Sequence, residues 1–350
     1  MIDKFHGGDV LAGTLDFSTN INPLGLSIKA REAIIKNIPA LTSYPQPDSR
    51  NLKKALADFH GIKQDNLAIG NGSIELIYLI PRALGLRKVL VITPTFSEYE
   101  FAARSSGAKV IFFKNKERDN FNLSLSKLTT YLSRVDSVFL CNPNNPTGLC
   151  LSKEEISTLA QLCFKRRTTL AIDEAFMDFV EGSSENNLIP VAAKRRGLII
   201  IRSITKFFAL PGLRIGYLVA HRDFISRISG LQYPWNVNSL AQAAGIAVLK
   251  DSDYMAQSRR YILEEREFLL NSLKNISGLK TFPPSSNFIL CKLEKCALKS
   301  AKVLNEKLSV RRIAVRNCAN FRGLNEKFFR VGVKKRAENI KLITSLREVL

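Results

Sequence analysis

The stretch "RSITKFFALPGLRIGY" (202–217) places Lys206 and Arg214 in a largely apolar frame. The apolar run at 199–201 predicts a buried strand, so Lys206 follows the carboxyl end of that strand. A Pro-Gly pair then predicts a turn, and Arg214 precedes a second apolar run. Ligands of α/β sheets bind beyond the carboxyl ends of strands. We therefore expect Lys206 to contact a ligand rather than to serve only as a solvated surface charge.

Short apolar strands alternate with amphipathic helices on both sides of this stretch. The segment "RKVLVITPTFSEYEFAARSSG" (87–107) is typical of a strand, a turn and a helix. The segment "TTLAIDEAFMDF" (168–179) indicates another buried strand. This alternation predicts an α/β fold with a mainly parallel sheet and helices on both faces.

A different pattern begins in the last third of the chain. A helical stretch from about 239 to 275 leads into three short apolar and charged segments and a last helix, which predicts a smaller α+β lobe. We expect the hinge near "YPWNVN" (233–238). The predicted division is an N-terminal arm, a large domain and a small C-terminal domain at residues 1–35, 36–236 and 237–350.

The chain is strongly basic. Its 52 Lys and Arg residues against 31 Asp and Glu residues give a formal charge of +21, which favours anionic partners. The basic residues are scattered in short groups without a basic tail or an aromatic-interleaved basic motif, so we do not expect nucleic acid as a partner. A basic nucleic-acid-binding protein is the alternative from another functional class, and steeply salt-dependent DNA or RNA binding would favour it.

Cysteine and histidine usage argues against metal and disulfide chemistry. The six cysteines form no C-x-x-C pair, and only three histidines are present, so we expect no metal site and no disulfide framework. Free thiols suit a reducing cytoplasm. The N-terminus has no apolar core of signal-peptide length, and no segment approaches the ~20 apolar residues that cross a bilayer. We expect a cytoplasmic protein with no membrane partner.

Polar and aromatic side chains follow several other predicted strands. Asp173 ends the run "TLAID", and Phe96 follows another strand in "PTF". The segment "CNPNNPTG" (141–148) is a loop whose prolines fix φ and whose asparagines offer amide groups. Each motif alone is compatible with a plain turn or a helix cap. Their common place at strand ends favours a binding site.

The segment "GNGS" (70–73) predicts a phosphate site. Its glycines leave backbone N–H groups unhindered at the start of a helix, where an anion is stabilised by the helix dipole. We call this site the phosphate cup. It is completed by the hydroxyls of Ser203 and Thr205 and by the guanidinium of Arg214. Together, a lysine, a carboxylate, an amide loop, an aromatic ring and a phosphate cup are the groups needed to hold pyridoxal phosphate.

In their order and their residues, these motifs resemble those of the fold-type I pyridoxal phosphate enzymes of the histidinol-phosphate aminotransferase group, and the resemblance covers nearly the whole chain. The resemblance implies a mainly parallel, seven-stranded type of sheet in a large domain, with a smaller α+β C-terminal domain. It implies that Lys206 bonds to the cofactor as a Schiff base and that Asp173 pairs with the pyridine nitrogen. It assigns the ring oxygen to Asn145 and stacking to Phe96.

The same resemblance assigns a group of residues to the cofactor phosphate: Asn71, Gly72, Ser73, Ser203, Thr205 and Arg214. Tyr44, in "SYPQPD", matches a tyrosine that reaches the cofactor phosphate of the other subunit. A homodimer is therefore implied.

Three further segments are similar to the L-threonine-O-3-phosphate decarboxylases of cobalamin biosynthesis, which make (R)-1-amino-2-propanol O-2-phosphate. They are "HGGD" (6–9), "DFSTNINPLG" (16–25) and "VRNCANFRGL" (315–324). Phe176 also stands where most of the aminotransferases have a tyrosine. The substrate contacts implied by this resemblance are His6, Gly7, Asn20, Asn145, Arg316 and Arg330.

The sequence departs from the decarboxylase pattern at Asp9, Thr19 and the Ser73-Ile74 pair. A carboxylate near a phosphate pocket is unfavourable, so we expect Asp9 to point away from it. Two alternatives stay open: an aminotransferase acting on histidinol phosphate, and a decarboxylase that prefers serine phosphate. The two decarboxylase substrates differ by one methyl group, worth only ~1–3 kcal/mol in a pocket.

Overall fold

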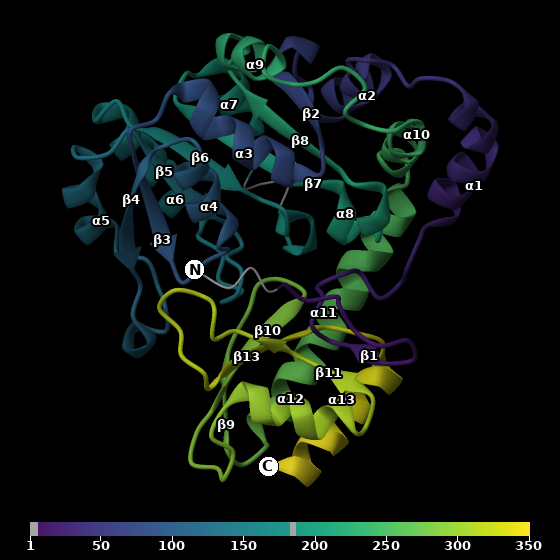
Figure 1. Cartoon of the computed structure of the whole chain (residues 1–350), viewed down its shortest axis with the longest axis vertical. Helices are drawn as coiled ribbons and strands as arrows, with labels where there is room; N and C mark the ends of the chain where they lie inside the picture. Colours follow the sequence, from purple (N-terminus) through teal and green to yellow (C-terminus); the bar gives the residue numbers. More distant parts are fainter. Residues whose placement is uncertain (1–5, 183–186) are drawn as a thin grey trace.

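The computed structural model describes residues 6–182 and 187–350. Two lobes lie one above the other in Figure 1, a large lobe built on a seven-stranded sheet and a small lobe built on a four-stranded sheet. The strand order of the large sheet is β2-β8-β7-β6-β5-β3-β4. The strands of this sheet are β2 (Leu67–Asn71), β3 (Lys88–Thr93), β4 (Lys109–Lys114), β5 (Ser137–Cys141), β6 (Thr169–Asp173), β7 (Leu198–Ser203) and β8 (Ile215–Ala220).

The prediction of a mainly parallel sheet is confirmed. β8 is antiparallel to both of its neighbours, β2 and β7, and the other strand pairs are parallel. All residues of β5, β7 and β8 are buried, as expected for strands covered by helices on both faces. The carboxyl ends of β3, β5, β6 and β7 therefore meet at one edge of the sheet.

Helices cover both faces of the large sheet (Figure 1). α6 illustrates their sequence signals: the Ser152 hydroxyl accepts the Glu155 N–H at 3.2 Å, and the Glu155 carboxylate accepts the Ser152 N–H at 2.8 Å. The helices before the hinge are α1 (Ile28–Asn37), α2 (Arg50–His60), α3 (Ser73–Leu84), α4 (Glu98–Ser105), α5 (Leu125–Leu132), α6 (Lys153–Lys165), α7 (Ile189–Lys194), α8 (Ile204–Phe207) and α9 (Arg222–Ser229). Short 3-10 turns are η1 (Ile38–Thr42), η2 (Gln64–Asn66), η3 (Glu117–Asp119), η4 (Met177–Phe179) and η5 (Pro211–Leu213).

The helical stretch expected at 239–275 consists of two helices, α10 (Ser239–Val248) and α11 (Ser252–Lys274). The buried Asp251 separates them, with its carboxylate 3.6 Å from the Lys29 ammonium. α10 packs on α1 and α2, whereas α11 runs down to the small lobe (Figure 1). The division of the chain at 236 stays a prediction.

The small lobe contains β9 (Leu279–Phe282), β10 (Phe288–Leu293), β12 (Arg316–Asn317) and β13 (Phe328–Gly332), with α12 (Ala301–Ser309) and α13 (Arg336–Val349). Its four-stranded sheet is antiparallel. β1 (Leu15–Asp16) pairs in parallel with β11 (Ile313–Ala314), so the N-terminal arm joins the small lobe. The Gly332 N–H also donates to the Phe17 carbonyl at 2.8 Å.

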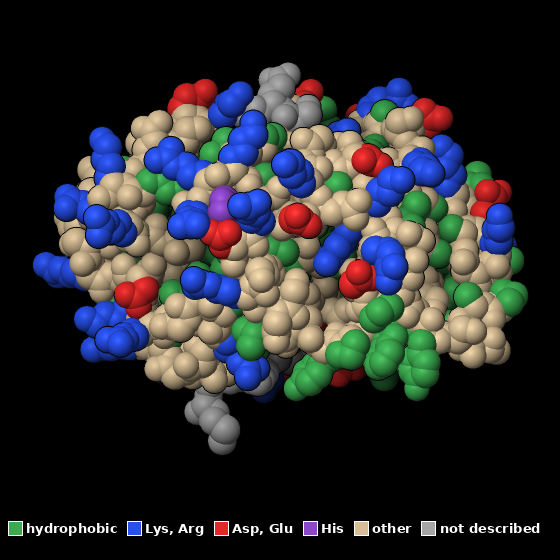
Figure 2. All heavy atoms as spheres, turned by 90° about the horizontal axis from the view of Figure 1, so that it is seen from above, with side chains coloured by type: hydrophobic (Ala, Val, Ile, Leu, Met, Phe, Trp, Pro, Cys, Tyr) green, Lys and Arg blue, Asp and Glu red, His purple; other side chains and the backbone are tan. Residues whose placement is uncertain are grey.

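Lys and Arg side chains are spread over the face in Figure 2 among neutral and acidic ones. All six cysteines are free thiols. Within the described ranges, no three or more His, Cys, Asp or Glu side chains are placed to hold a metal ion. None of the helices in that part of the chain has the length and apolar character needed to cross a membrane.

Candidate active site

Lys206 lies on α8, directly after β7, where the sequence placed it. Its ammonium donates to the Thr205 hydroxyl at 3.0 Å. Burial lowers the pKa of Lys206 to about 8, with help from the positive charges of Arg214 and Arg330 and against the opposing charge of Asp173. An amine of lowered pKa is more often neutral, which is the form that attacks a carbonyl group.

Asp173 ends β6 and is 4% exposed. Its carboxylate accepts the Tyr99 hydroxyl at 2.7 Å and the Ala175 N–H at 2.9 Å. Burial raises the pKa of Asp173, and these two hydrogen bonds and the charge of Lys206 oppose that shift. The adjacent Glu174 instead pairs with Arg202 at 2.7 Å, so the two neighbouring carboxylates have different partners.

The predicted phosphate cup forms where α3 meets β8. Gly72 precedes α3 with φ +74°, and no side chain caps the helix, so the first N–H groups of α3 are available to an anion. A Cβ on Gly72 would lie 2.6 Å from Nη2 of Arg214, and a Cβ on Gly216 would lie 2.4 Å from the Ser73 nitrogen. Glycine at both positions lets the guanidinium and β8 approach the start of the helix.

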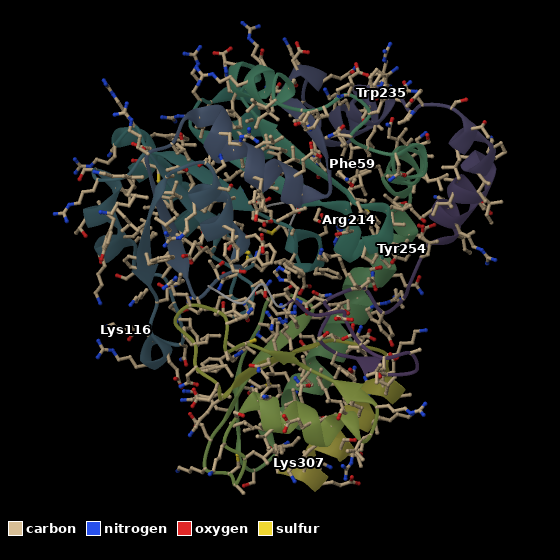
Figure 3. All side chains as sticks on the ribbon, viewed as in Figure 1. Phe59, Lys116, Arg214, Trp235, Tyr254 and Lys307 are labelled. Carbon is tan, nitrogen blue, oxygen red and sulfur yellow. The ribbon has the colours of Figure 1, made fainter. Side chains whose placement is uncertain are left out.

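Two hydroxyls and Arg214 complete the cup. The hydroxyls of Ser203 and Thr205 lie 2.7 Å apart. Arg214 has φ +56° and donates to the Pro211 carbonyl at 3.2 Å. Figure 3 shows Arg214 beside α8, in the large lobe. The backbone N–H of Asn71 is already bonded to the Glu75 carboxylate at 2.5 Å, so it does not serve as a donor for the cup.

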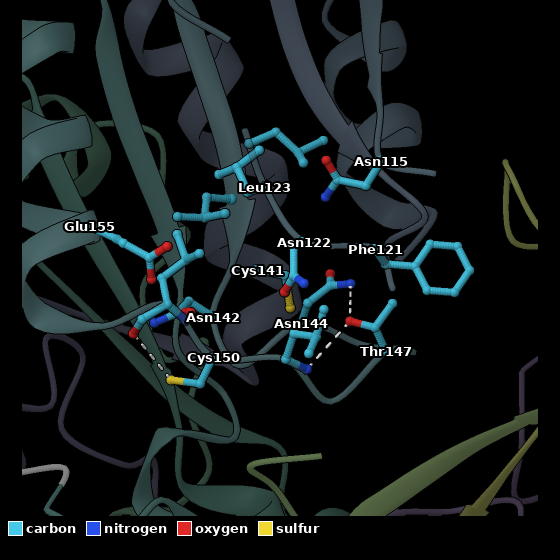
Figure 4. Close-up of a pocket in the computed structure, with 14 residues that line it drawn as sticks. Asn115, Phe121, Asn122, Leu123, Cys141, Asn142, Asn144, Thr147, Cys150 and Glu155 are labelled. Carbon is cyan, nitrogen blue, oxygen red and sulfur yellow. Dashed lines mark hydrogen bonds between the residues drawn. The ribbon is translucent and has the colours of Figure 1, made fainter. Parts of the chain in front are cut away.

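The side chains of the asparagine loop (141–148) point in two directions. Asn145 accepts a hydrogen bond from Arg330, on the side of the small lobe. Asn144 donates to the Pro94 carbonyl and to the Thr147 hydroxyl, both at 2.9 Å. Asn144 and Thr147 line the pocket of Figure 4 together with Asn142, Cys150 and other residues, and Asn145 does not. The loop thus presents the Asn145 side chain toward Arg330, and its last residue, Gly148, also contacts the small lobe through its carbonyl, which accepts the Ser285 N–H at 2.8 Å.

Phe96 follows β3 and is only partly buried. Its ring centroid lies 5.8 Å from that of Tyr99 in an edge-on arrangement and 5.7 Å from that of His6. The sequence predicted both Phe96 and His6, and the structure brings them together across the boundary between the arm and the large lobe. The position of Phe96 suits a ring that covers a flat ligand.

Two arginines of the small lobe face this region from β12 and β13. Arg330 is 6% exposed and donates to Asn145 and, at 2.7 Å, to the Ser18 carbonyl, while its buried Nε has no hydrogen-bond partner among the described residues. Arg316 is 4% exposed and donates to Asn320 at 2.8 Å. Burial lowers the pKa of Arg330, and the charge of Arg316 adds to this. Both guanidiniums are therefore placed to gain from an anionic ligand.

The N-terminal arm contributes the other residues predicted for substrate. A Cβ on Gly7 would lie 2.5 Å from the Ser18 carbonyl oxygen, so the two arm segments are in close contact. Asn20 is 5% exposed and its Oδ1 has no hydrogen-bond partner in the described part of the chain. Asp9 is exposed and lines a surface cavity together with His6 and Gly7, and its orientation away from the phosphate pocket stays a prediction.

Tyr44 lies apart from the other predicted residues within one chain. It is 84% exposed, and its ring packs on Trp235 at a centroid distance of 5.0 Å. The sequence did not point to Tyr99, whose hydroxyl donates to Asp173, or to Gly216, which lets β8 approach the start of α3. Tyr99 carries a weak signal because it follows Phe96 by one helical turn.

The residues present fit pyridoxal phosphate. An uncapped helix N-terminus, two hydroxyls and Arg214 suit its phosphate, and the buried Asp173 suits a pyridinium nitrogen. Lys206, with its lowered pKa, suits the aldehyde. The orphaned Nε of Arg330 and Oδ1 of Asn20 leave polar capacity for a second ligand beside it.

Comparison with known proteins gives a consistent result. Residues 12–346 match the aminotransferase class I and II family. The chain belongs to this family. A protein of Caldanaerobacter subterraneus subsp. tengcongensis, provisionally named threonine-phosphate decarboxylase, is 38% identical over 98% of this chain and 93% of its own length. The threonine-phosphate decarboxylase of Salmonella typhimurium is 34% identical over 100% of this chain and 98% of its own length.

The fold agrees with that of a solved family member. The histidinol-phosphate aminotransferase of Clostridium acetobutylicum superposes with a TM-score of 0.89 at 35% identity, covering 96% of this chain and 98% of the other. The predicted fold-type I architecture of this aminotransferase-family chain is confirmed, and so is its resemblance to the threonine-phosphate decarboxylases.

Substitution of Tyr99 by Phe tests the support of Asp173. Tyr99→Phe keeps the ring but removes a hydrogen bond to a charged group, worth roughly 1.5–3 kcal/mol, so we expect pyridoxal phosphate to bind at least about tenfold more weakly. The measurement is equilibrium titration of the apoprotein with the cofactor. Tyr217→Phe, which removes a partly buried hydrogen bond of 2.8 Å to His60, is the control. Equal weakening in both variants would contradict a specific role for Tyr99.

The pKa of Lys206 can be tested in the apoprotein. Acylation of Lys206 by acetic anhydride, followed by peptide mass spectrometry, should increase with pH to a plateau with a midpoint near pH 8. Because the Arg214 charge lowers this pKa, Arg214→Gln should move the midpoint to higher pH. Arg196→Gln, at a side chain that is 79% exposed, should leave it in place. An unchanged midpoint in Arg214→Gln would exclude the coupling.

Proposed function

We propose that this chain is a pyridoxal phosphate-dependent carboxy-lyase that converts L-threonine O-3-phosphate into (R)-1-amino-2-propanol O-2-phosphate and carbon dioxide for the nucleotide loop of cobalamin. The observation that carries the proposal is the pair of buried guanidiniums, Arg316 and Arg330, on adjacent strands beside Asn145. One small substrate with both a carboxylate and a phosphate can engage both. The names of the relatives from Caldanaerobacter and Salmonella support the same reaction.

The chain's own residues divide the work in this mechanism. Arg316 and Arg330 bind the two anionic groups of the substrate and fix the direction of the carboxylate relative to Cα. Pyridoxal phosphate supplies the electron sink that stabilises the negative charge left at Cα when carbon dioxide departs. Asp173 holds a proton on the pyridine nitrogen through its negative charge, which Tyr99 supports.

Lys206 completes the reaction as a proton carrier. The bond between Cα and the carboxylate breaks, its electron pair stays with Cα, and a proton from the Lys206 ammonium is delivered to Cα. The lowered pKa of about 8 makes this ammonium a stronger acid than an exposed lysine. Phe96 and the arm residues His6 and Gly7 cover the site and restrict the access of water.

The test is turnover of purified holoenzyme with threonine phosphate and no oxo-acid acceptor. We expect steady release of carbon dioxide and formation of aminopropanol phosphate. Serine phosphate is compared next, because it differs from threonine phosphate by one methyl group, which changes binding by only ~1–3 kcal/mol. Amino transfer seen only with histidinol phosphate and 2-oxoglutarate, without carbon dioxide, would overturn the proposal in favour of the aminotransferase.

A homodimer is the second part of this proposal. Apolar side chains are exposed along α1 and η1, a few residues before Tyr44, and exposed apolar side chains that gather on one segment are typical of a protein interface. Their exposed fractions are Ile28 75%, Ile35 55%, Ile38 51%, Leu41 57% and Tyr44 84%. In the dimer, Tyr44 reaches the cofactor phosphate of the partner chain. The free thiols support a reducing cytoplasm as the compartment.

Introducing a charge into this patch tests the dimer. Ile38→Asp should convert the protein from dimer to monomer in analytical ultracentrifugation and weaken its binding of pyridoxal phosphate, because Tyr44 is then lost from the partner site. Val310, which is 83% exposed on the small lobe, provides the matched control Val310→Asp. A monomeric wild-type holoenzyme would contradict the proposal.

A further inference from the structure

The first turn of α4 carries two buried carboxylates that the proposed mechanism does not use. Glu98 is 7% exposed and Glu100 is 4% exposed. α4 begins just after Phe96, at the edge of the sheet where the candidate site lies. A buried carboxylate is unfavourable unless charged or polar partners compensate it. Each carboxylate has one partner within the large lobe, Tyr78 for Glu98 and Arg104 for Glu100. Each has a second partner from a distant segment that carries a predicted substrate contact.

Glu98 joins the N-terminal arm to the large lobe. The Nε2 atom of His6 lies 3.0 Å from Oε1 of Glu98, across 92 residues of sequence. The hydroxyl of Tyr78, on α3, donates to Oε2 at 2.6 Å and fixes the carboxylate from the other side. His6 is thereby held against the Phe96 ring. Glu98 thus determines where the arm crosses the site.

Glu100 holds a loop of the small lobe. The Arg322 guanidinium donates to its two oxygens at 3.0 and 3.1 Å, across 222 residues of sequence, and stacks over the Phe112 ring at 4.1 Å. Arg322 belongs to the loop at 318–327 between β12 and β13. In the same loop, Asn320 accepts a hydrogen bond from Arg316 at 2.8 Å. The Glu100–Arg322 pair thus fixes the loop that orients Arg316.

We propose that Glu98 and Glu100 are positioning residues for the substrate: one helical turn of the large lobe holds the arm through His6 and the 318–327 loop through Arg322. The inference rests on the proposed function for the identity of the substrate. Both carboxylates act through other residues and touch no reacting atom. The Glu98–His6 hydrogen bond and the Glu100–Arg322 ion pair hold segments from opposite ends of the chain beside the site.

The charge of the two carboxylates and their positioning role predict opposite changes in KM when the carboxylates are replaced. A carboxylate near a site for an anionic substrate weakens substrate binding through its charge, so replacing it by a neutral amide would by charge alone lower KM. A positioning role predicts the opposite, because His6 or Arg316 loses its fixed place. The direction of the change in KM therefore separates the two effects.

The experiment compares the holoenzyme variants Glu98→Gln, Glu100→Gln and Glu117→Gln by steady-state kinetics and by hydrogen exchange without substrate. Glu117 is the control, since its carboxylate also joins the large lobe to the small lobe but accepts from Lys280 at 3.2 Å and Lys292 at 2.7 Å, and so bonds neither His6 nor Arg322. The conservative Arg322→Lys keeps the positive charge but loses the two-pronged geometry.

We expect KM for threonine phosphate to rise about tenfold in Glu98→Gln and in Glu100→Gln, as for loss of a hydrogen bond to a charged group, with kcat within about threefold. Exchange should accelerate at residues 6–14 only in Glu98→Gln and at residues 318–327 only in Glu100→Gln. Arg322→Lys should give an intermediate change at 318–327. Glu117→Gln should keep KM and exchange at both segments near wild type.

A KM that falls or stays constant in both variants, or exchange that increases equally in all of them, would overturn the proposal. Its failure is distinguishable from failure of the proposed function, because the exchange experiment needs no turnover. If the wild-type enzyme releases no carbon dioxide while the exchange pattern holds, the reaction is wrong and the positioning role stands. KM is then measured with the substrate that the enzyme does convert.

Discussion

Repulsion between the cations gathered around Lys206 is the constraint on which this site depends. The positive charges of the exposed Arg214 and the buried Arg330 lower the pKa of Lys206, and the charge of the buried Arg316 lowers that of Arg330. Asp173 is a buried acid among them, and its own pKa is raised by burial. Like charges in a region of low dielectric destabilise the protein unless anions compensate them. The fold tolerates this arrangement because a phosphorylated cofactor and an anionic substrate relieve it.

These cations come from different elements of the two lobes, so the lobes must meet for the site to exist. Arg330 connects all three: it extends from β13 of the small lobe to Asn145 of the large lobe and to the Ser18 carbonyl of the arm. A guanidinium can do this because its planar fork donates in several directions. The side chain that we propose to bind substrate therefore also joins the three parts of the chain that form the site.

The sequence predicted those parts of the site that follow from local pattern. Lys206, Asp173 and the asparagine loop lie beyond apolar runs, and the carboxyl ends of parallel strands must share an edge. The roles of Glu98 and Glu100 could not be predicted this way, because their partners are 92 and 222 residues away and exposed and buried acids have the same pattern on a short helix. Tyr44 was named by resemblance alone, and one chain does not bring it to the site.

The charge balance also discriminates between the two reactions that this family makes plausible. Histidinol phosphate carries a phosphate but no carboxylate, so in its complex only one of Arg316 and Arg330 would be neutralised by the substrate. Threonine phosphate carries both groups on a short skeleton and neutralises both guanidiniums at once. Since a charge-assisted hydrogen bond between a guanidinium and a carboxylate or phosphate is among the strong ones, the pair favours the doubly charged substrate. An aminotransferase would engage the second arginine only in the half-reaction with its carboxylate-bearing amino acceptor or donor, whereas the decarboxylase uses both in every turnover.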